Sequence, residues 1–193
     1  GARRAARRRP CEPGVSAPPV VILCGGRGTR LQEHTHAIPK PLVEIGPHPI
    51  VWHVVQLYAV QGFREFVLCT GYKGEQIVEF VERARWPEGI DVRCEDTGLD
   101  APTGGRIARV RDVVGDRRFC ATYSDGVADI DLQGTLEFHD GHGAAATMTV
   151  VRPELQFGVA EMDAEDRVLG FREKPRAEHW VNGGFFVFEP AVF

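Results

Sequence analysis

A glycine-rich segment near the start of the chain is the clearest sign of chemistry in the sequence. The apolar run 20–24 leads directly into Gly25, Gly26 and Gly28, which are three glycines within four residues. Glycine adopts backbone angles that other residues avoid, and a ligand can approach its N–H group without meeting a Cβ. At the carboxyl end of a buried first strand, such a loop predicts an anion-binding cradle. A glycine turn that holds no ligand is the alternative.

Two common phosphate-binding loops do not fit this segment. A P-loop would end in Gly-Lys followed by Ser or Thr, whereas this loop continues as Gly28-Thr29-Arg30. The dinucleotide-binding fingerprint would begin at Gly26-Arg27-Gly28, but Leu31 occupies its third glycine position. The loop is therefore expected to be an anion cradle of another kind.

Charged side chains occur where they could complete a site for phosphate chemistry. Arg30 places a guanidinium beside the loop amides, and Lys40 lies between two prolines on a stiff, extended segment. Asp125 follows the apolar run 119–123 and precedes a glycine, so its carboxylate could hold Mg²⁺ together with phosphate oxygens. An ordinary loop lysine and a turn aspartate are the plainer interpretations.

These residues require elements that bring them to one edge of a sheet. Short β-branched runs alternate with helical patterns as far as about residue 153, which predicts an α/β fold. We expect a Rossmann-like, mostly parallel sheet with helices on both faces, followed by a smaller mixed β region. The predicted strands are 20–24, 65–70, 90–93, 119–123, 146–151, 158–162, 168–173 and 184–188. The predicted helices are 50–61, 75–83, 106–113 and 132–142, with Asp129 expected to cap the last.

Together the motifs resemble those of the sugar-phosphate nucleotidyltransferase family. The pattern Gly-Gly-x-Gly-Thr-Arg-Leu followed by Pro-Lys-Pro is similar to that of the whole superfamily. Three later runs resemble the glucose-1-phosphate cytidylyltransferase branch in particular: Thr-Gly-Gly-Arg at 103–106, Asp-Gly-Val-Ala-Asp at 125–129 and Asn-Gly-Gly-Phe-Phe at 182–186. The resemblance extends from about residue 20 to the end of the chain.

The resemblance implies a reaction between a nucleoside triphosphate and a sugar 1-phosphate. The resemblance to the cytidylyltransferase branch implies that these are CTP and glucose 1-phosphate. A sugar-phosphate oxygen attacks the α-phosphorus and pyrophosphate leaves, with Mg²⁺ as the implied cofactor. Because the reactants are crowded with negative charge, catalysis is expected to rest on alignment and electrostatic stabilisation. A guanylyl- or thymidylyltransferase, or a catalytically weak nucleotide-binding module, is the alternative.

The resemblance also assigns roles to residues. The expected catalytic residues are Arg30, Lys40 and Asp125, the last of which also holds the metal. The nucleotide is expected to contact Leu23, Cys24, Gly25, Gly26, Arg27, Gly28, Thr29, Thr103, Gly104 and Arg106. The sugar phosphate is expected to contact Gly158, Glu173, Lys174 and Asn182. A plain helix start at 103–106 and a solvated ion pair at 173–174 are the alternatives.

Composition separates a basic tail from an acidic body. Residues 1–19 hold five arginines against one acid and have almost nothing to bury, so we expect a disordered basic tail rather than a nucleic-acid or membrane-surface arm. The acidic body argues against wide nucleic-acid contact, which needs basic patches. Residues 20–193 are expected to form one nucleotidyltransferase domain that is truncated at its C-terminus, because the family's second metal-binding aspartate would lie beyond Phe193.

The cysteines and histidines indicate no metal or disulfide framework. Cys24, Cys69 and Cys120 each end or interrupt an apolar run, as buried free cysteines do, which points to a reducing cytoplasm. His139 and His142 lack a third ligand at a fixed spacing, so surface histidines are expected. No apolar run approaches the roughly 18 residues of a membrane span. The expected partners are therefore small-molecule substrates, without nucleic acid or membrane, and a homo-oligomer is left open.

Overall fold

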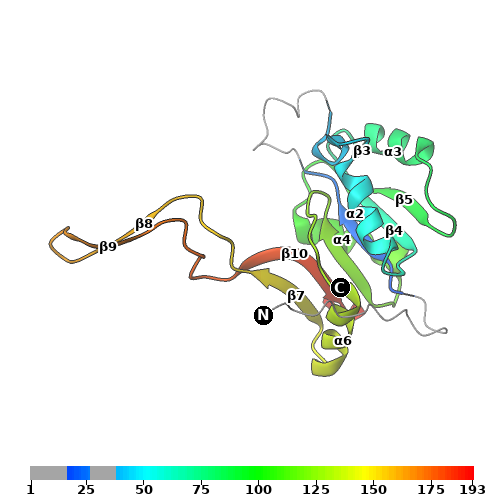
Figure 1. Cartoon of the computed structure of the whole chain (residues 1–193). Coiled ribbons are helices and arrows are strands. Elements are labelled where there is room, and N and C mark those ends of the chain that lie inside the picture. The colour runs from blue at the N-terminus through cyan, green and yellow to red at the C-terminus, as the bar shows by residue number, and fades with distance from the viewer. Residues whose placement is uncertain (1–16, 27–37) are drawn as a thin grey trace. The chain divides into compact units, whose positions relative to one another are not determined.

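The main sheet of the chain has six strands, four of which lie wholly in the first of two compact units. The computed structural model describes residues 17–26 and 38–193, and the sheet has the order β5-β4-β1-β6-β10-β7 (Figure 1). In that order its strands are Asp91–Asp96, Glu65–Thr70, Val20–Leu23, Phe119–Tyr123, Val181–Phe188 and Ala146–Val151. Strands β5, β4, β1 and β6 run parallel, and β10 runs antiparallel to β6. The mostly parallel sheet expected from the sequence is confirmed.

Each central strand is apolar throughout because both of its faces are buried. In β1, Val20 and Ile22 join one buried cluster, whereas Val21 and Leu23 join the other. Successive side chains of a strand point to opposite faces, so a strand covered on both sides reads as a continuous apolar run.

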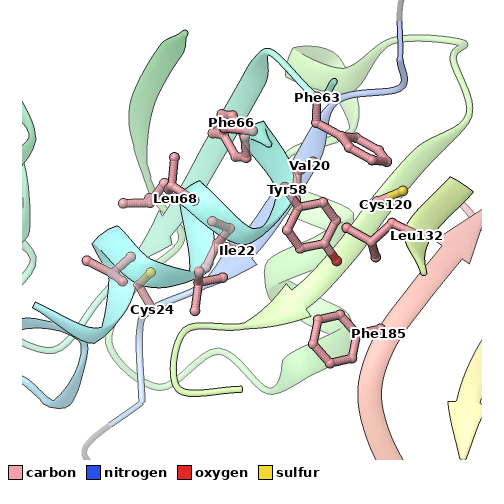
Figure 2. Close-up of a cluster of buried hydrophobic side chains, with 14 of the residues drawn as sticks. Val20, Ile22, Cys24, Tyr58, Phe63, Phe66, Leu68, Cys120, Leu132 and Phe185 are labelled. Carbon is pink, nitrogen blue, oxygen red and sulfur yellow. The ribbon is translucent and has the colours of Figure 1, made fainter. Parts of the chain in front are cut away.

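Helices cover both faces of the sheet, as predicted. Helices α2 (Ile50–Ala59), α3 (Gly74–Arg83) and α6 (Leu132–His142) contribute to the cluster of Val20, and α4 (Thr103–Arg109) and α5 (Arg111–Val114) lie at the other. Figure 2 shows Tyr58 of α2 among side chains from β1, β4, β6 and β10. The single helix predicted at 106–113 is in fact two short helices, because the backbone of Val110 leaves the helical region between them.

The second unit comprises Met148–Gly184, while the first runs to Thr147 and resumes at Phe185–Phe193. The second unit contains the antiparallel hairpin of β8 (Val159–Met162) and β9 (Val168–Arg172). The strand predicted at 184–188 does not belong to this later β region alone. It is part of β10, because its Phe185 and Val187 are buried in the core beside β6.

Short elements complete the chain. They are the 3₁₀ turns η2 (Lys40–Leu42) and η3 (Pro190–Val192) and the small hairpin of β2 (Glu44–Ile45) and β3 (His48–Pro49). The carbonyl of Pro19 accepts a hydrogen bond from the Cys120 N–H group at 2.9 Å, and Ala17 packs against the core. The expectation that the tail extends to residue 19 is therefore wrong for residues 17–19, and residues 1–16 lie outside the described part.

The cysteines behave as the sequence predicts. Cys24, Cys69 and Cys120 are buried and not in disulfides. Burial raises the pKa of Cys69 and of Cys120 to about 12, so both remain thiols at neutral pH. Within residues 17–26 and 38–193, no helix has the length and apolar character needed to cross a membrane.

Helix α6 is fixed by polar contacts that the sequence did not reveal. Its N-cap is Asp131, whose carboxylate accepts from the Gly134 N–H group at 2.9 Å, so the expectation that Asp129 is the cap is wrong. His139 is 1% exposed and contacts Thr147 at 2.7 Å and Glu189 at 3.0 Å. It is thus a buried structural histidine rather than a surface one.

Candidate functional site

Four loops meet where the parallel strands end. We name them the β1 loop (residues 24–26), the β4 loop (71–73), the β5 loop (97–99) and the β6 loop (124–126). Backbone hydrogen bonds tie these loops to the neighbouring strand or loop: Tyr72 to Gly25 at 3.3 Å, Thr97 to Thr70 at 3.1 Å and Ser124 to Leu23 at 3.4 Å. Ligands of open α/β sheets bind at this edge, so the sheet creates a candidate site beside the β1 loop.

Two of the predicted catalytic residues meet at this edge. Lys40 opens the 3₁₀ turn η2, directly after the extended Pro39, so it is not on a fully extended segment as expected. Asp125 lies in the β6 loop, and the Lys40 ammonium forms an ion pair with its carboxylate. Both side chains are about one-third exposed, at 29% and 36%, so the pair can be reached by a ligand.

The start of the glycine segment is anchored by its strand. The Cys24 N–H group donates to the Cys69 carbonyl at 3.0 Å, and the side chains of Leu23 and Cys24 are buried in opposite faces of the core. A nucleotide could therefore meet these two residues only through their backbone. The continuation of the segment, with the predicted contacts Arg27, Gly28, Thr29 and Arg30, lies outside the described residues.

Arg106 is buried and its guanidinium is surrounded by acceptors from the protein itself. The residue is 6% exposed. Its donors reach five acceptors: the carbonyls of Thr70 (3.0 Å), Gly98 (2.7 Å), Gly25 (3.0 Å) and Leu99 (3.1 Å) and the hydroxyl of Thr97 (2.8 Å). A phosphate or base contact by Arg106 would require some of these bonds to be released, and it stays a prediction.

The glycines around Arg106 leave room for its guanidinium. A Cβ on Gly25 would lie 2.0 Å from Nη1 of Arg106, and a Cβ on Gly71 would lie 2.7 Å from the same atom. Both distances are far below van der Waals contact, so the close approach itself requires glycine at these positions.

Thr103 and Gly104 form the exposed first turn of α4, directly after Pro102. A Cβ on Gly104 would meet nothing within 4 Å, so packing among the described residues does not explain this glycine. Their predicted contact with the nucleotide stays a prediction.

Sequence reasoning assigned no role to the β5 loop or to Arg109. Gly98 turns the loop with φ of 79°, and its N–H group donates to Asp96 at 2.8 Å. Arg109, one helical turn beyond Arg106, donates to the Thr97 carbonyl. The partner of Arg109 is a backbone carbonyl, which any residue provides, so residue types give no signal for this contact.

The predicted sugar-phosphate residues all lie in the second unit. Val159 pairs with Arg172 in the hairpin, so Gly158 and Glu173 lie at the same end of it. A Cβ on Gly158 would lie 2.2 Å from the Phe171 ring, so this exposed ring would have to move to accept a larger residue.

Lys174 and Asn182 have distinct local settings within that unit. Lys174 has φ of 41°, a left-handed conformation that is strained for a residue with a side chain. The Asn182 side chain accepts from the Gly184 N–H group at 2.8 Å. Contact of either residue with a sugar phosphate stays a prediction.

The comparison with protein families decides the classification. The model of the family described as nucleotidyl transferase matches residues 19–193, which include all four loops. This chain belongs to the nucleotidyl transferase family. The family relationship that the motifs predicted is thereby confirmed.

Individual members of the family show close similarity. The chain is 42% identical over 195 residues to a glucose-1-phosphate cytidylyltransferase of Salmonella typhi. The alignment covers 89% of this chain and 75% of the relative. A probable glucose-1-phosphate cytidylyltransferase of Bacillus subtilis is 40% identical over 192 residues, covering 90% and 75% respectively. The crystal structure of HddC from Yersinia pseudotuberculosis matches with a TM-score of 0.68 and 23% identity, over 91% of this chain and 78% of that one. At that identity the structural match supports the fold alone.

Proposed function

We propose that this protein transfers a cytidylyl group from CTP to glucose 1-phosphate, forming CDP-glucose and releasing pyrophosphate. The observation that carries the proposal is the Lys40–Asp125 ion pair beside the β1 loop, which unites a cation for phosphate and a carboxylate for a metal ion. The choice of CTP and glucose 1-phosphate is supported by the 42% and 40% identity to cytidylyltransferases.

The proposed reaction needs no protein nucleophile. An oxygen of the sugar phosphate attacks the α-phosphorus of CTP, and a new P–O bond forms as the bond to the bridging oxygen of pyrophosphate breaks. Negative charge accumulates on the departing pyrophosphate, so cations held at the site stabilise the transition state more than the ground state. Alignment of the two substrates supplies the rest of the acceleration.

Of the two cations proposed to stabilise the phosphates, Lys40 lies within the described residues. Without substrate its charge is balanced by Asp125, and in the proposed complex the ammonium turns to the phosphates. Arg30 is proposed as the second cation from the sequence, since it lies outside the described residues.

Asp125 fits a magnesium ion that is shared with the nucleotide. In the described part of the chain, no three His, Cys, Asp or Glu side chains cluster as a metal site would. Mg²⁺ is commonly held by one or two carboxylates together with substrate phosphates, and the Lys40 ammonium already places a positive charge against Asp125. The Asp125 carboxylate would hold the ion, which would neutralise phosphate charge when bound.

The nucleotide and the sugar are proposed to use separate parts of the chain. The backbone of Leu23, Cys24, Gly25 and Gly26 and the first turn of α4 at Thr103 and Gly104 would contact CTP, with Arg27, Gly28 and Thr29 added from the sequence. Gly158, Glu173, Lys174 and Asn182 would contact the sugar phosphate. The left-handed backbone of Lys174 supports this assignment, because strained residues cluster at ligand sites.

A cytoplasmic location is part of the proposal. It is supported by the cysteines Cys24, Cys69, Cys94 and Cys120, which are free in the structure. Free buried thiols are typical of reducing compartments.

The test is a substrate panel on the full-length protein with Mg²⁺, scored by pyrophosphate release. CTP, GTP, UTP and dTTP are each combined with glucose 1-phosphate and mannose 1-phosphate. We expect the pair of CTP and glucose 1-phosphate to turn over fastest. Ten-fold faster turnover with GTP or dTTP would overturn the cytidylyl assignment, and no release with any pair would overturn the reaction itself.

A further inference from the structure

Arg106 joins two loops of the site and the end of a third strand through one side chain. Its guanidinium donates to Gly25 in the β1 loop, to Thr97, Gly98 and Leu99 in the β5 loop, and to Thr70 at the end of β4. These acceptors lie at or just after the carboxyl ends of three parallel strands, β1, β4 and β5. Their separations from Arg106 range from 7 residues for Leu99 to 81 for Gly25.

The charge of Arg106 is balanced by carbonyl groups rather than by a carboxylate. None of the ion pairs among residues 17–26 and 38–193 includes Arg106, although the residue is 6% exposed. A buried charge is unfavourable unless hydrogen bonds compensate it, and four carbonyls and a hydroxyl do so here. Only a planar, multi-donor guanidinium can reach acceptors spread in this way, since an ammonium is a compact point donor.

One of the contacts of Arg106 is with the β1 loop. Its Nη2 donates to the Gly25 carbonyl at 3.0 Å, and the Tyr72 N–H group donates to the same carbonyl at 3.3 Å. The guanidinium also occupies the space in which a Cβ on Gly25 would lie. The direction of the Gly25 carbonyl, and with it the course of the backbone into Gly26, therefore depends on Arg106.

We propose that Arg106 is a positioning residue that holds the backbone of the β1 loop in the conformation that binds the nucleotide. The proposal rests on the proposed function, and it places Arg106 in contact with the loop backbone instead of with the phosphates. Because its bonds are already formed without a ligand, Arg106 prepares the loop before CTP binds, which reduces the ordering needed on binding.

Hydrogen exchange in the ligand-free protein tests the first part of the proposal. The Tyr72 amide reports on the Gly25 carbonyl, and the Cys24 amide, which is bonded to Cys69, is the internal reference. Arg106→Lys keeps the positive charge but cannot reach all the acceptors, so the Tyr72 amide should exchange at least about ten-fold faster. The Cys24 amide should be unchanged.

Calorimetric titration with CTP and Mg²⁺ tests the second part. Arg106→Lys should raise the Kd for CTP by at least about ten-fold. Arg109→Lys is the matched control, because Arg109 lies on the same helix and donates to Thr97 but not to Gly25. Arg109→Lys should leave both the Kd for CTP and the Tyr72 exchange rate within about two-fold of the natural protein. Melting curves of the two variants test whether either is generally unfolded.

Gly25→Ala tests the contact itself and remains usable if the Arg106 variants do not fold. Its new Cβ would displace the guanidinium, so it should reproduce the faster Tyr72 exchange and the weaker CTP binding. In an Arg106→Ala background the space is open, so the same substitution should weaken CTP binding less than it does in the natural chain.

Three results would overturn the proposal. The first is a Tyr72 amide in Arg106→Lys that exchanges at the rate of the natural protein. The second is weaker CTP binding by Arg106→Lys without any change in Tyr72 exchange, which would indicate a direct ligand contact. The third is an equal effect of Gly25→Ala on CTP binding in the natural chain and in the Arg106→Ala background. Failure of the proposed function is recognised separately, because it would abolish pyrophosphate release by the natural protein while the ligand-free exchange still reports on the loop.

Discussion

The two units of the molecule differ in how far they bury their large apolar side chains. In the first, Phe63, Phe66 and Phe119 are fully buried between the sheet and its helices. In the second, Phe157 is 80% exposed and Phe171 65% exposed, and neither strand of the hairpin has a buried residue. The first unit is therefore stabilised by its core, whereas the second depends mainly on local backbone pairing.

This difference implies that the two groups of proposed site residues are positioned in different ways. Lys40, Asp125 and Arg106 are attached to elements that cannot move without disturbing buried packing. Glu173 and Lys174 follow a short exposed strand, and Lys174 is held in a strained conformation. Substitutions of Glu173 and Lys174 should thus alter binding of the sugar phosphate with little effect on the stability of the fold.

The largest expected effect is a difference in how much a Phe→Ala substitution destabilises the fold in each of the two units. Phe66→Ala removes a fully buried ring and should lower the free energy of unfolding by about 3–5 kcal/mol. Phe157→Ala makes the same chemical change at an exposed position and should lower it by less than about 1 kcal/mol. Urea unfolding followed by circular dichroism measures both, and similar losses in the two variants would remove the contrast.

A second prediction concerns the sugar phosphate. Lys174→Ala should raise the KM for glucose 1-phosphate about ten-fold and change turnover at saturation much less, because the proposed contact is present in both ground and transition states. Glu165→Gln, in the exposed turn of the same hairpin, is the control and should leave the KM unchanged. An unaltered KM in Lys174→Ala would exclude the assigned contact.

A third prediction concerns pH. Partial burial raises the pKa of Glu189, but hydrogen bonds from Arg118 and His139 more than offset this and lower it below 4.5. A carboxyl whose pKa is lower in the folded state stabilises the fold above its unfolded pKa, and this contribution is lost as the pH falls through the folded value.

Glu189→Gln should therefore be less stable than the natural protein by about 1 kcal/mol at pH 7, and the difference should shrink below about pH 4.5. Unfolding midpoints at a series of pH values measure this, with the exposed Glu88→Gln as the control. A difference that is constant down to pH 3 would contradict the assigned role of Glu189.

The smallest effect concerns the N-terminus. Deleting residues 1–16 should leave the melting temperature unchanged, because their composition offers nothing to bury. Deleting residues 1–19 also removes the hydrogen bond between the Pro19 carbonyl and Cys120 and the packing of Ala17 against the core. This longer deletion should lower the melting temperature by a few degrees. Equal melting temperatures for the two deletions would show that residues 17–19 add nothing to the body.

Much of the fold was predictable because burial leaves a pattern in the sequence. The strands 65–70, 119–123 and 146–151 and the helix 132–142 were predicted with the bounds that the structure has. Each is an apolar or periodic run that ends at polar or glycine residues. The break at Val110 was missed because it lies inside an otherwise helical pattern.

The site was predictable only in part because its contacts are distant in sequence. Lys40 and Asp125 are 85 residues apart, and a parallel sheet brings them together without any local signal. Arg106 was predicted to face a ligand, but four of its five acceptors are backbone carbonyls, which any residue provides. Its surroundings could not be read from residue types.

Pyrophosphate release by Asp125→Asn and Lys40→Met, with CTP and glucose 1-phosphate, tests the central claim most directly. Both residues are partly exposed and form a surface ion pair, so their loss should change stability little. Turnover should fall at least about 100-fold in each variant, which corresponds to roughly 3 kcal/mol in the activation barrier. Near-normal release by both folded variants would show that the chemistry takes place elsewhere in the protein.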